Sequence, residues 1–136
     1  MDAASVGALA AGLLAEACGD GDDLHASTVR GLAEDLGRAL RPLSGAGTAD
    51  ALVGAALACA DLATLAACNA AVLPVRAGPS AVAATHLAAG AARALAALGE
   101  AEIGATDDAY AGNALRDLRI AVWKSDLAVR QLGERG

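Results

Sequence analysis

Residues 51–75 read ALVGAALACADLATLAACNAAVLPV, and this stretch decides the fold class. Alanine is the best helix former, whereas the β-branched and aromatic residues that favour strands are scarce in the chain. The stretch is long enough to cross a membrane, but Asp61 and Asn69 interrupt it and no tryptophan or tyrosine anchors its ends. We therefore expect a helix that is buried on most of its sides inside a helical bundle.

The whole chain has the same character. Its 136 residues suit a single domain, residues 1–136, and they include 16 glycines, one tryptophan, one tyrosine and no phenylalanine. A core of alanine, leucine and valine fills space only where helix backbones approach each other closely. The composition therefore predicts an all-α fold.

Charge and cysteine content narrow the functional classes. The net charge is −6 and no basic run is present, which argues against nonspecific binding to nucleic acid or to an anionic membrane. Cys18, Cys59 and Cys68 form no CxxC motif, and His25 and His86 are far apart, so the sequence predicts no metal site. We expect reduced cysteines in a cytoplasmic protein, because the N-terminal residues do not show a signal-peptide pattern.

The spacing of apolar and helix-ending residues predicts an antiparallel bundle of about five helices joined by short connections. Pro42 and Pro74 end the second and the third helix, and Thr48 or Asp50 can cap the third. Thr106 and the two aspartates after it open the fifth. The expected helices cover residues 3–18, 24–42, 48–73, 78–99 and 106–132.

The last of these helices carries two apolar stripes. A broad stripe runs along one side, and Ile120, Trp123 and Leu127 form a second stripe on nearly the opposite side. A helix on the surface of a monomer needs only the first. Because large aromatic residues concentrate at interfaces, we expect a homodimer formed through the second stripe. The alternative is a central helix within a monomer.

Polar residues that interrupt the apolar helices are candidate site residues. Asp61 either faces a cleft, where burial would prepare it for proton transfer, or is solvated or paired with Arg93 or Arg76. His86 and Arg93 lie seven residues apart and share a helix face. They either bind a carboxylate substrate or form a structural polar edge.

The segment Gly19-Asp20-Gly21-Asp22 joins the first two expected helices. A glycine-rich turn lets two carboxylates converge on one cation. The segment resembles the GDGD turn of the helical nucleotide-binding domain of dihydroxyacetone kinases, in which aspartates hold magnesium against the phosphates of ADP. That resemblance implies a magnesium-nucleotide site at Asp20 and Asp22. The alternative is a plain turn between helices.

A second resemblance spans most of the chain. Residues 5–16, SVGALAAGLLAE, are similar to the first helix of the cyclodeaminase/cyclohydrolase family, the helical folate enzymes related to formiminotransferase-cyclodeaminase. Residues 73–76, LPVR, resemble the family's VP-x-R corner, and residues 105–109, ATDDA, resemble its SD-x-x-x-A segment. Residues 1–4, MDAA, replace the Pro-Gly-Gly-Gly loop that normally precedes the first helix.

This resemblance implies an all-helical dimer that binds a tetrahydrofolate derivative and acts on a one-carbon C–N bond as a hydrolase or lyase. The site would lie near the start of the first helix, the Pro74 corner and the Asp107–Asp108 pair. A divergent member would bind a folate or another small anionic ligand. The alternative is a non-catalytic helical dimer or a partner subunit of a larger assembly, which accounts for the missing glycine loop and for the second apolar stripe.

The enzyme hypothesis assigns a role to each candidate residue. Asp107 or Asp108 is the acid/base group. Arg76 and Arg93 hold carboxylates of the ligand. Asp61 together with His86 polarises the one-carbon centre or a water. The residues are Asp107, Asp108, Asp61 and His86 for catalysis, and Arg76, Arg93 and Thr106 for the ligand.

Overall fold

The computed structural model describes residues 2–19, 23–73, 78–105 and 111–135, and these residues form five α-helices and one 3₁₀ turn, without a strand. The all-α fold predicted from the sequence is confirmed. The elements are α1 (Ala3–Cys18), α2 (Leu24–Leu40), the 3₁₀ turn η1 (Arg41–Leu43), α3 (Ala49–Asn69), α4 (Gly78–Gly104) and α5 (Ala111–Arg135).

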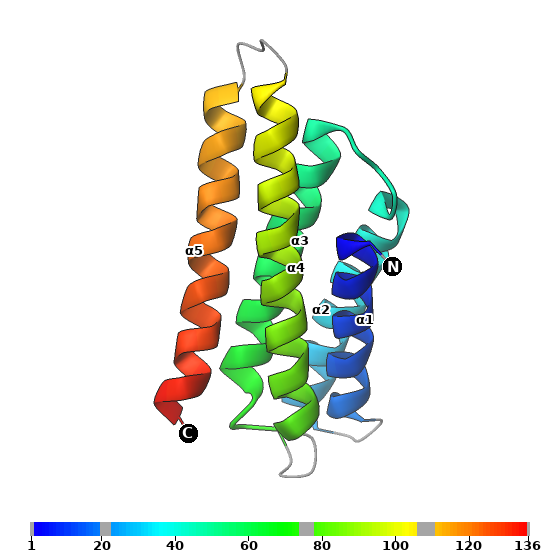
Figure 1. The fold of residues 1–136 in the computed structure, drawn as a ribbon. Helices are drawn as coiled ribbons and strands as arrows, with labels where there is room; N and C mark the ends of the chain where they lie inside the picture. Colours follow the sequence, from blue (N-terminus) through cyan, green and yellow to red (C-terminus); the bar gives the residue numbers. More distant parts are fainter. Residues whose placement is uncertain (1, 20–22, 74–77, 106–110, 136) are drawn as a thin grey trace.

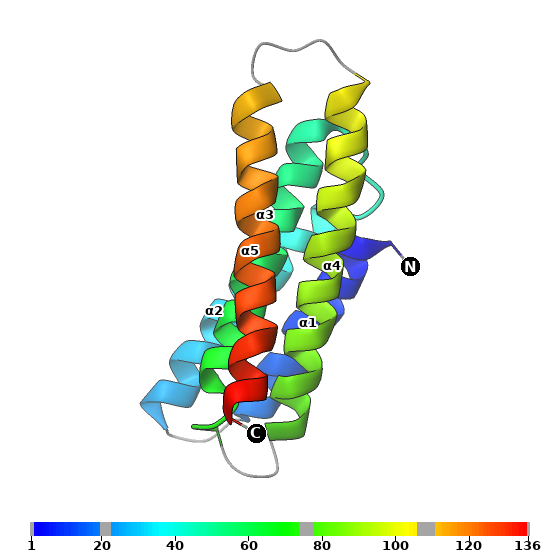
Figure 2. The same ribbon diagram turned by 60° about the vertical axis from the view of Figure 1, so that its left-hand side comes forward.

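Successive helices run in opposite directions, so the bundle is antiparallel as expected (Figure 1). α3 and α4 pack most extensively against each other and form its centre. α5 packs against α3 and α4 on one side of the bundle, whereas α1 and α2 cover another side (Figures 1 and 2). α5 is therefore an outer helix, and the alternative of a central last helix is wrong.

The helices differ in length, and this difference creates a step on the surface. α1 has 16 residues, whereas α4 has 27 and extends roughly 40 Å at 1.5 Å per residue. The N-terminal end of α1 consequently lies beside the middle of α4 (Figure 1). Beyond this point α3, α4 and α5 continue without α1.

Small residues bring the helices close together. At Gly7 of α1 an added Cβ would lie 2.5 Å from the Sγ of Cys59 on α3, and at Gly99 of α4 it would lie 2.9 Å from a methyl of Leu118 on α5. Alanines occupy most of the buried positions between them. The largest fully buried side chains of the core include Leu14, Leu40, Leu62 and Leu118.

Side-chain oxygens cap the first three α-helices. Asp2 accepts a hydrogen bond from the backbone N–H of Ser5 at 2.9 Å, and Asp23 accepts one from the N–H of His25 at 2.9 Å. Thr48 caps α3, as predicted. Each cap satisfies a donor that the first turn of a helix leaves free.

The end of α3 differs from the prediction. The helix ends at Asn69, not near residue 73, because the residues after it close a turn. The backbone carbonyl of Asn69 accepts a hydrogen bond from the N–H of Leu73 at 3.0 Å. The side-chain amide of Asn69 donates a hydrogen bond to the backbone carbonyl of Leu65 at 2.8 Å. The side-chain oxygen of Asn69 is also 2.6 Å from Nε2 of His25, which ties the start of α2 to the end of α3.

Three further helix ends differ from the prediction. α4 continues past Gly99 to Gly104, because Gly99 is a packing glycine that faces α5 and does not end the helix. α2 ends at Leu40, and Pro42 lies in η1, which continues the chain for three residues. The described part of α5 begins at residue 111 and continues to residue 135, past the predicted end.

α3 and α4 are each long and apolar enough to cross a membrane by length and composition. About half of the residues in the most apolar part of each helix are buried inside the bundle. Core helices of a soluble bundle have the same composition, so these two helices are weak evidence for a membrane protein.

Candidate functional site

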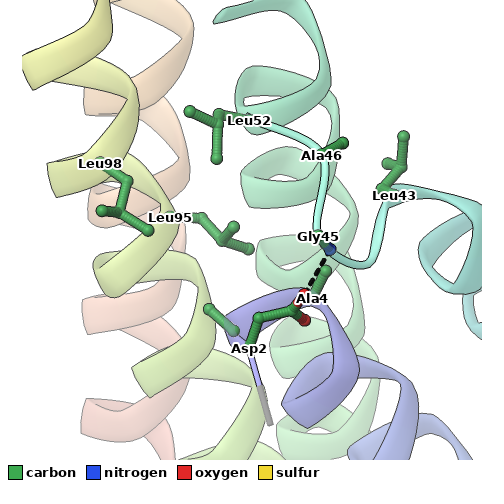
Figure 3. A pocket seen from close by; sticks show the side chains of 9 residues that line it. Asp2, Ala4, Leu43, Gly45, Ala46, Leu52, Leu95 and Leu98 are labelled. Atoms are coloured by element: carbon green, nitrogen blue, oxygen red, sulfur yellow. Dashed lines mark hydrogen bonds between the residues drawn. The ribbon is translucent and has the colours of Figure 1, made fainter. Parts of the chain in front are cut away.

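A pocket of about 190 Å³ lies at the step where α1 begins (Figure 3). Its walls come from the start of α1, the turn after η1, the first turn of α3 and the middle of α4. Apolar side chains dominate, and Asp2 contributes the only carboxylate among the residues that line it: Asp2, Ala3, Ala4, Leu43, Gly45, Ala46, Leu52, Leu95 and Leu98.

Leu95 and Leu98 of α4 form the far wall of this pocket, opposite the start of α1 (Figure 3). Leu95 is buried, whereas Leu98 is about half exposed at the rim. The volume is below the roughly 300–1,000 Å³ that is usual for ligand sites. The pocket therefore fits one apolar side chain or one small ring more readily than a whole folate.

The Asp2 carboxylate joins α1 to the turn after η1. Besides the bond from Ser5, it accepts a hydrogen bond from the Ser44 hydroxyl at 3.1 Å. It also accepts one from the backbone N–H of Gly45 (Figure 3). These bonds lower the pKa of Asp2, the backbone N–H of Ser5 most and its side chain next. The carboxylate is therefore held ionised and engaged by its own chain, which suits a structural latch better than a general acid.

Asp61 does not line the pocket at the start of α1. It lies exposed on α3 and forms an ion pair with Lys124 of α5. The interpretation of a solvated and paired carboxylate is confirmed, but the partner is Lys124 and not Arg93. Since the pair lies partly in solvent, it links α3 to α5 with a modest contribution to stability.

Arg93 also belongs to the contact with α5. Its Nη1 is 2.9 Å from Oδ1 of Asp126, and the Arg93 side chain is largely exposed whereas that of Asp126 is partly exposed. His86 is exposed on α4 and makes no hydrogen bond or ion pair with a described residue. Neither His86 nor Arg93 lines the pocket at the start of α1, and Arg93 holds α4 against α5.

The remaining predicted site residues, Arg76, Thr106, Asp107 and Asp108, lie outside the described residues, as do Asp20 and Asp22. Their roles stay predictions. Among the residues that the structure describes, no group of three histidine, cysteine, aspartate or glutamate side chains could hold a metal ion.

The cysteines divide into two buried thiols, Cys18 and Cys59, and one exposed thiol, Cys68, and none of them forms a disulfide. Burial raises the pKa of Cys59 to about 12 and also raises the pKa of Cys18, whose thiol feels a smaller opposing effect from Arg30. Neither thiol is therefore a nucleophile at neutral pH. Their small, apolar side chains fill the core, as the sequence predicts.

The most distinctive described surface lies on the side of α5 that faces away from α3 and α4. Trp123 is 65% exposed and Ile120 is 41% exposed, while Leu127 beside them is half-buried. Arg116, Arg119 and Arg130 surround them, and each is exposed. We call Ile120, Trp123, Arg116, Arg119 and Arg130 the outer face of α5.

Sequence reasoning found the apolar part of this face and missed its arginines. Arg116 and Arg130 lie seven residues before and after Trp123, a spacing that returns to the same side of a helix after two turns. This spacing is the signal that could have identified them from the sequence.

Comparisons with known proteins add no assignment. No family model matches the chain, and no curated protein or solved structure matches it either. The resemblances to cyclodeaminases and to dihydroxyacetone kinases therefore stay predictions, and the candidate sites rest on the geometry described above.

Proposed function

We propose that this protein is a non-catalytic helical subunit that binds another protein chain through the outer face of α5. The observation that carries the proposal is the exposure of Trp123, the single tryptophan of the chain, on an outer helix. A tryptophan that packs against no core contributes little to the isolated fold. The large apolar surface of a tryptophan stabilises a complex when a partner protein covers it.

The size of this apolar surface is sufficient for an anchor. Covering a tryptophan and a neighbouring isoleucine removes on the order of 150 Å² of apolar surface from water, or roughly 4 kcal/mol at about 25 cal/mol per Å². A few such anchors supply most of the affinity of a typical interface. The outer face of α5 thus supports a weak or transient interaction by itself and a stable one within a larger interface.

The polar residues support the same conclusion. Asp61 and Arg93 form ion pairs that hold α5 on the bundle, and His86 is exposed with no hydrogen-bond or ion-pair partner in the described part of the chain. A catalytic group needs a partner that orients it and a site that excludes water. Asp61 and Arg93 are largely open to solvent, and their partners join them to α5 instead of orienting them toward the pocket at the start of α1.

Site-specific photo-crosslinking tests the proposal. A photoreactive residue replaces Trp123 in one sample and Leu32, which is 48% exposed on α2, in the control. We expect a discrete crosslinked product, with a second copy or with another protein, from position 123 only. Equal, diffuse labelling from both positions would contradict a binding role for α5.

Binding of a small ligand is a second candidate function. Its support is the pocket at the start of α1, where the cyclodeaminase resemblance implies that a folate would bind. A thermal-shift titration with tetrahydrofolate derivatives tests it. A ligand at 100 times its dissociation constant stabilises a protein by about 2.7 kcal/mol, which gives a shift of several degrees. A shift that Leu95→Gln removes supports this candidate, and the absence of a shift opposes it.

A further inference from the structure

The arginines of the outer face of α5 are arranged around Trp123. Arg116 and Arg130 lie seven residues away on either side, which is about 10 Å along the helix axis in each direction. Arg119 lies one turn from Trp123. None of the three guanidinium groups forms an ion pair with a residue that the structure describes. The apolar centre of this face is therefore flanked by positive charge at both ends.

This positive charge is local. Five of the ten basic residues of the chain follow residue 110, but only three of its sixteen acidic residues do. The rest of the chain is strongly acidic. Lys124 and Asp126 lie at the edges of α5 and pair with residues on α3 and α4, so Arg116, Arg119 and Arg130 are the basic residues of α5 that form no ion pair among the described side chains.

The positions of these arginines argue against a symmetric dimer formed by two copies of α5. In an antiparallel pair centred on Trp123, Arg116 of one copy would face Arg130 of the other. In a parallel pair, each arginine would face its own equivalent. Either arrangement places like charges opposite each other as the interface closes, which opposes association.

Nucleic acids and anionic membranes are also poor partners for the outer face of α5. Both present negative charge over an area much wider than α5, so they would also approach the acidic remainder of a chain with a net charge of −6. A short protein segment, by contrast, can carry its acidic residues opposite the arginines alone, away from the acidic remainder of the chain.

We infer that the occupant of the outer face of α5 is a segment of another protein that is apolar at its centre and carries acidic residues about 10 Å to either side. Its apolar side chain covers Trp123 and Ile120, and its carboxylates pair with Arg116 and Arg130. This inference rests on the proposed binding role of α5 and adds the chemistry of the partner.

A designed peptide tests the inference. The probe is a helical peptide with a central leucine and a glutamate seven residues before and after it, and a second peptide carries lysines in place of the glutamates. Because Trp123 is the only tryptophan, its fluorescence reports binding of a tryptophan-free peptide at this face. We expect the glutamate peptide to shift the Trp123 emission to shorter wavelength and to bind more weakly as salt is added.

Charge reversal identifies the residues involved. Arg116→Glu and Arg130→Glu should each weaken binding of the glutamate peptide about tenfold. Arg41→Glu, which changes the net charge equally on η1, should leave it unchanged. The double variant R116E/R130E should prefer the lysine peptide. Equal binding of both peptides by the unmodified protein, or no binding of either, overturns the inference.

Two parallel measurements separate this inference from the proposed function. A crosslink from position 123 to a second copy of the chain, with no binding of the glutamate peptide, overturns the acidic partner and keeps the binding role of α5. Binding of phosphatidylserine vesicles or of a single-stranded oligonucleotide in preference to the glutamate peptide overturns the inference as well.

Discussion

Gly7 of α1 faces Cys59 of α3 so closely that a Cβ on Gly7 would lie 2.5 Å from the cysteine Sγ. Real side chains do not approach to this distance, and Cys59 is fully buried, so neither residue can move aside without shifting a helix. The contact between α1 and α3 therefore depends on the absence of a side chain at position 7.

Gly7→Ala is expected to lower the free energy of unfolding by about 1–3 kcal/mol, because overpacking outweighs the better helix propensity of alanine. Gly12→Ala is the matched control on the same helix, since an added Cβ there meets open space. The control should stabilise the protein by up to about 1 kcal/mol. Urea denaturation measures both, and a stable Gly7→Ala variant would show that α1 is less tightly seated than described.

Asp2→Asn is expected to reduce stability in a pH-dependent manner. Hydrogen bonds from Ser5, Ser44 and Gly45 lower the pKa of Asp2 below its ordinary value of 3.8, so the ionised carboxylate stabilises the fold. A lowered pKa gives stabilisation that is present above the ordinary value and is lost as the pH falls through the folded-state pKa.

The urea midpoints of the unmodified protein and of Asp2→Asn should accordingly differ at neutral pH and converge below about pH 4. Glu34→Gln removes one negative charge at an exposed position on α2 and is the control. The difference between its urea midpoint and that of the unmodified protein should not change in this way with pH. A difference between Asp2→Asn and the unmodified protein that persists unchanged in acid would rule out the charged latch.

The three cysteines should react with a thiol reagent in a fixed order. Cys68 is exposed and should react in the folded protein, whereas Cys18 and Cys59 are buried and have raised pKa values. Time-resolved labelling with Ellman's reagent should give one fast thiol, and the other two should react only as the chain opens. Fast labelling of Cys59 in the native state would contradict the close contact with Gly7.

Trp123→Ser should change the free energy of unfolding by less than about 0.5 kcal/mol at low protein concentration, because the side chain contributes to no described core cluster. Leu118→Ala, on the opposite side of the same helix and fully buried, should cost about 2–5 kcal/mol. Thermal denaturation of the two variants compares them. A large loss for Trp123→Ser would mean that this tryptophan serves the fold and not a partner.

Asp61→Asn and Lys124→Met should each lower the free energy of unfolding by less than about 1 kcal/mol, because solvent reaches both side chains and screens their ion pair. The double variant should cost less than the sum of the two, since both single changes remove the same pair. A double-mutant cycle measures this coupling, and additive costs would indicate that the pair is not formed in solution.

Much of the fold could be predicted from the sequence, because alanine and leucine in long runs leave few alternatives to packed helices. The two ends of α1 and the Thr48 cap followed from local chemistry. The ends of α3 and α4 did not, since they depend on the turn after Asn69 and on the contact of Gly99 with Leu118. A glycine that ends a helix and a glycine that admits a neighbour look the same in a sequence.

The candidate site was less predictable for a related reason. Asp61 and Lys124 are 63 positions apart, and only the placement of α5 against α3 reveals that they pair. The exposed stripe containing Trp123 was predictable because it depends on the periodicity of one helix. The sequence did not predict which helix lies at the centre of the bundle, because that depends on how all five helices pack together.

The outer position of α5 also sets the order in which the bundle can be completed during synthesis. The ribosome makes the chain from its N-terminus, and domains assemble as their segments emerge. α3 and α4 therefore leave the ribosome before the helix that covers their shared surface exists, and Leu118, Ala121 and Ala128 arrive last to close it. Until α5 packs, the nascent protein exposes to solvent the surface of α3 and α4 that α5 covers in the complete fold.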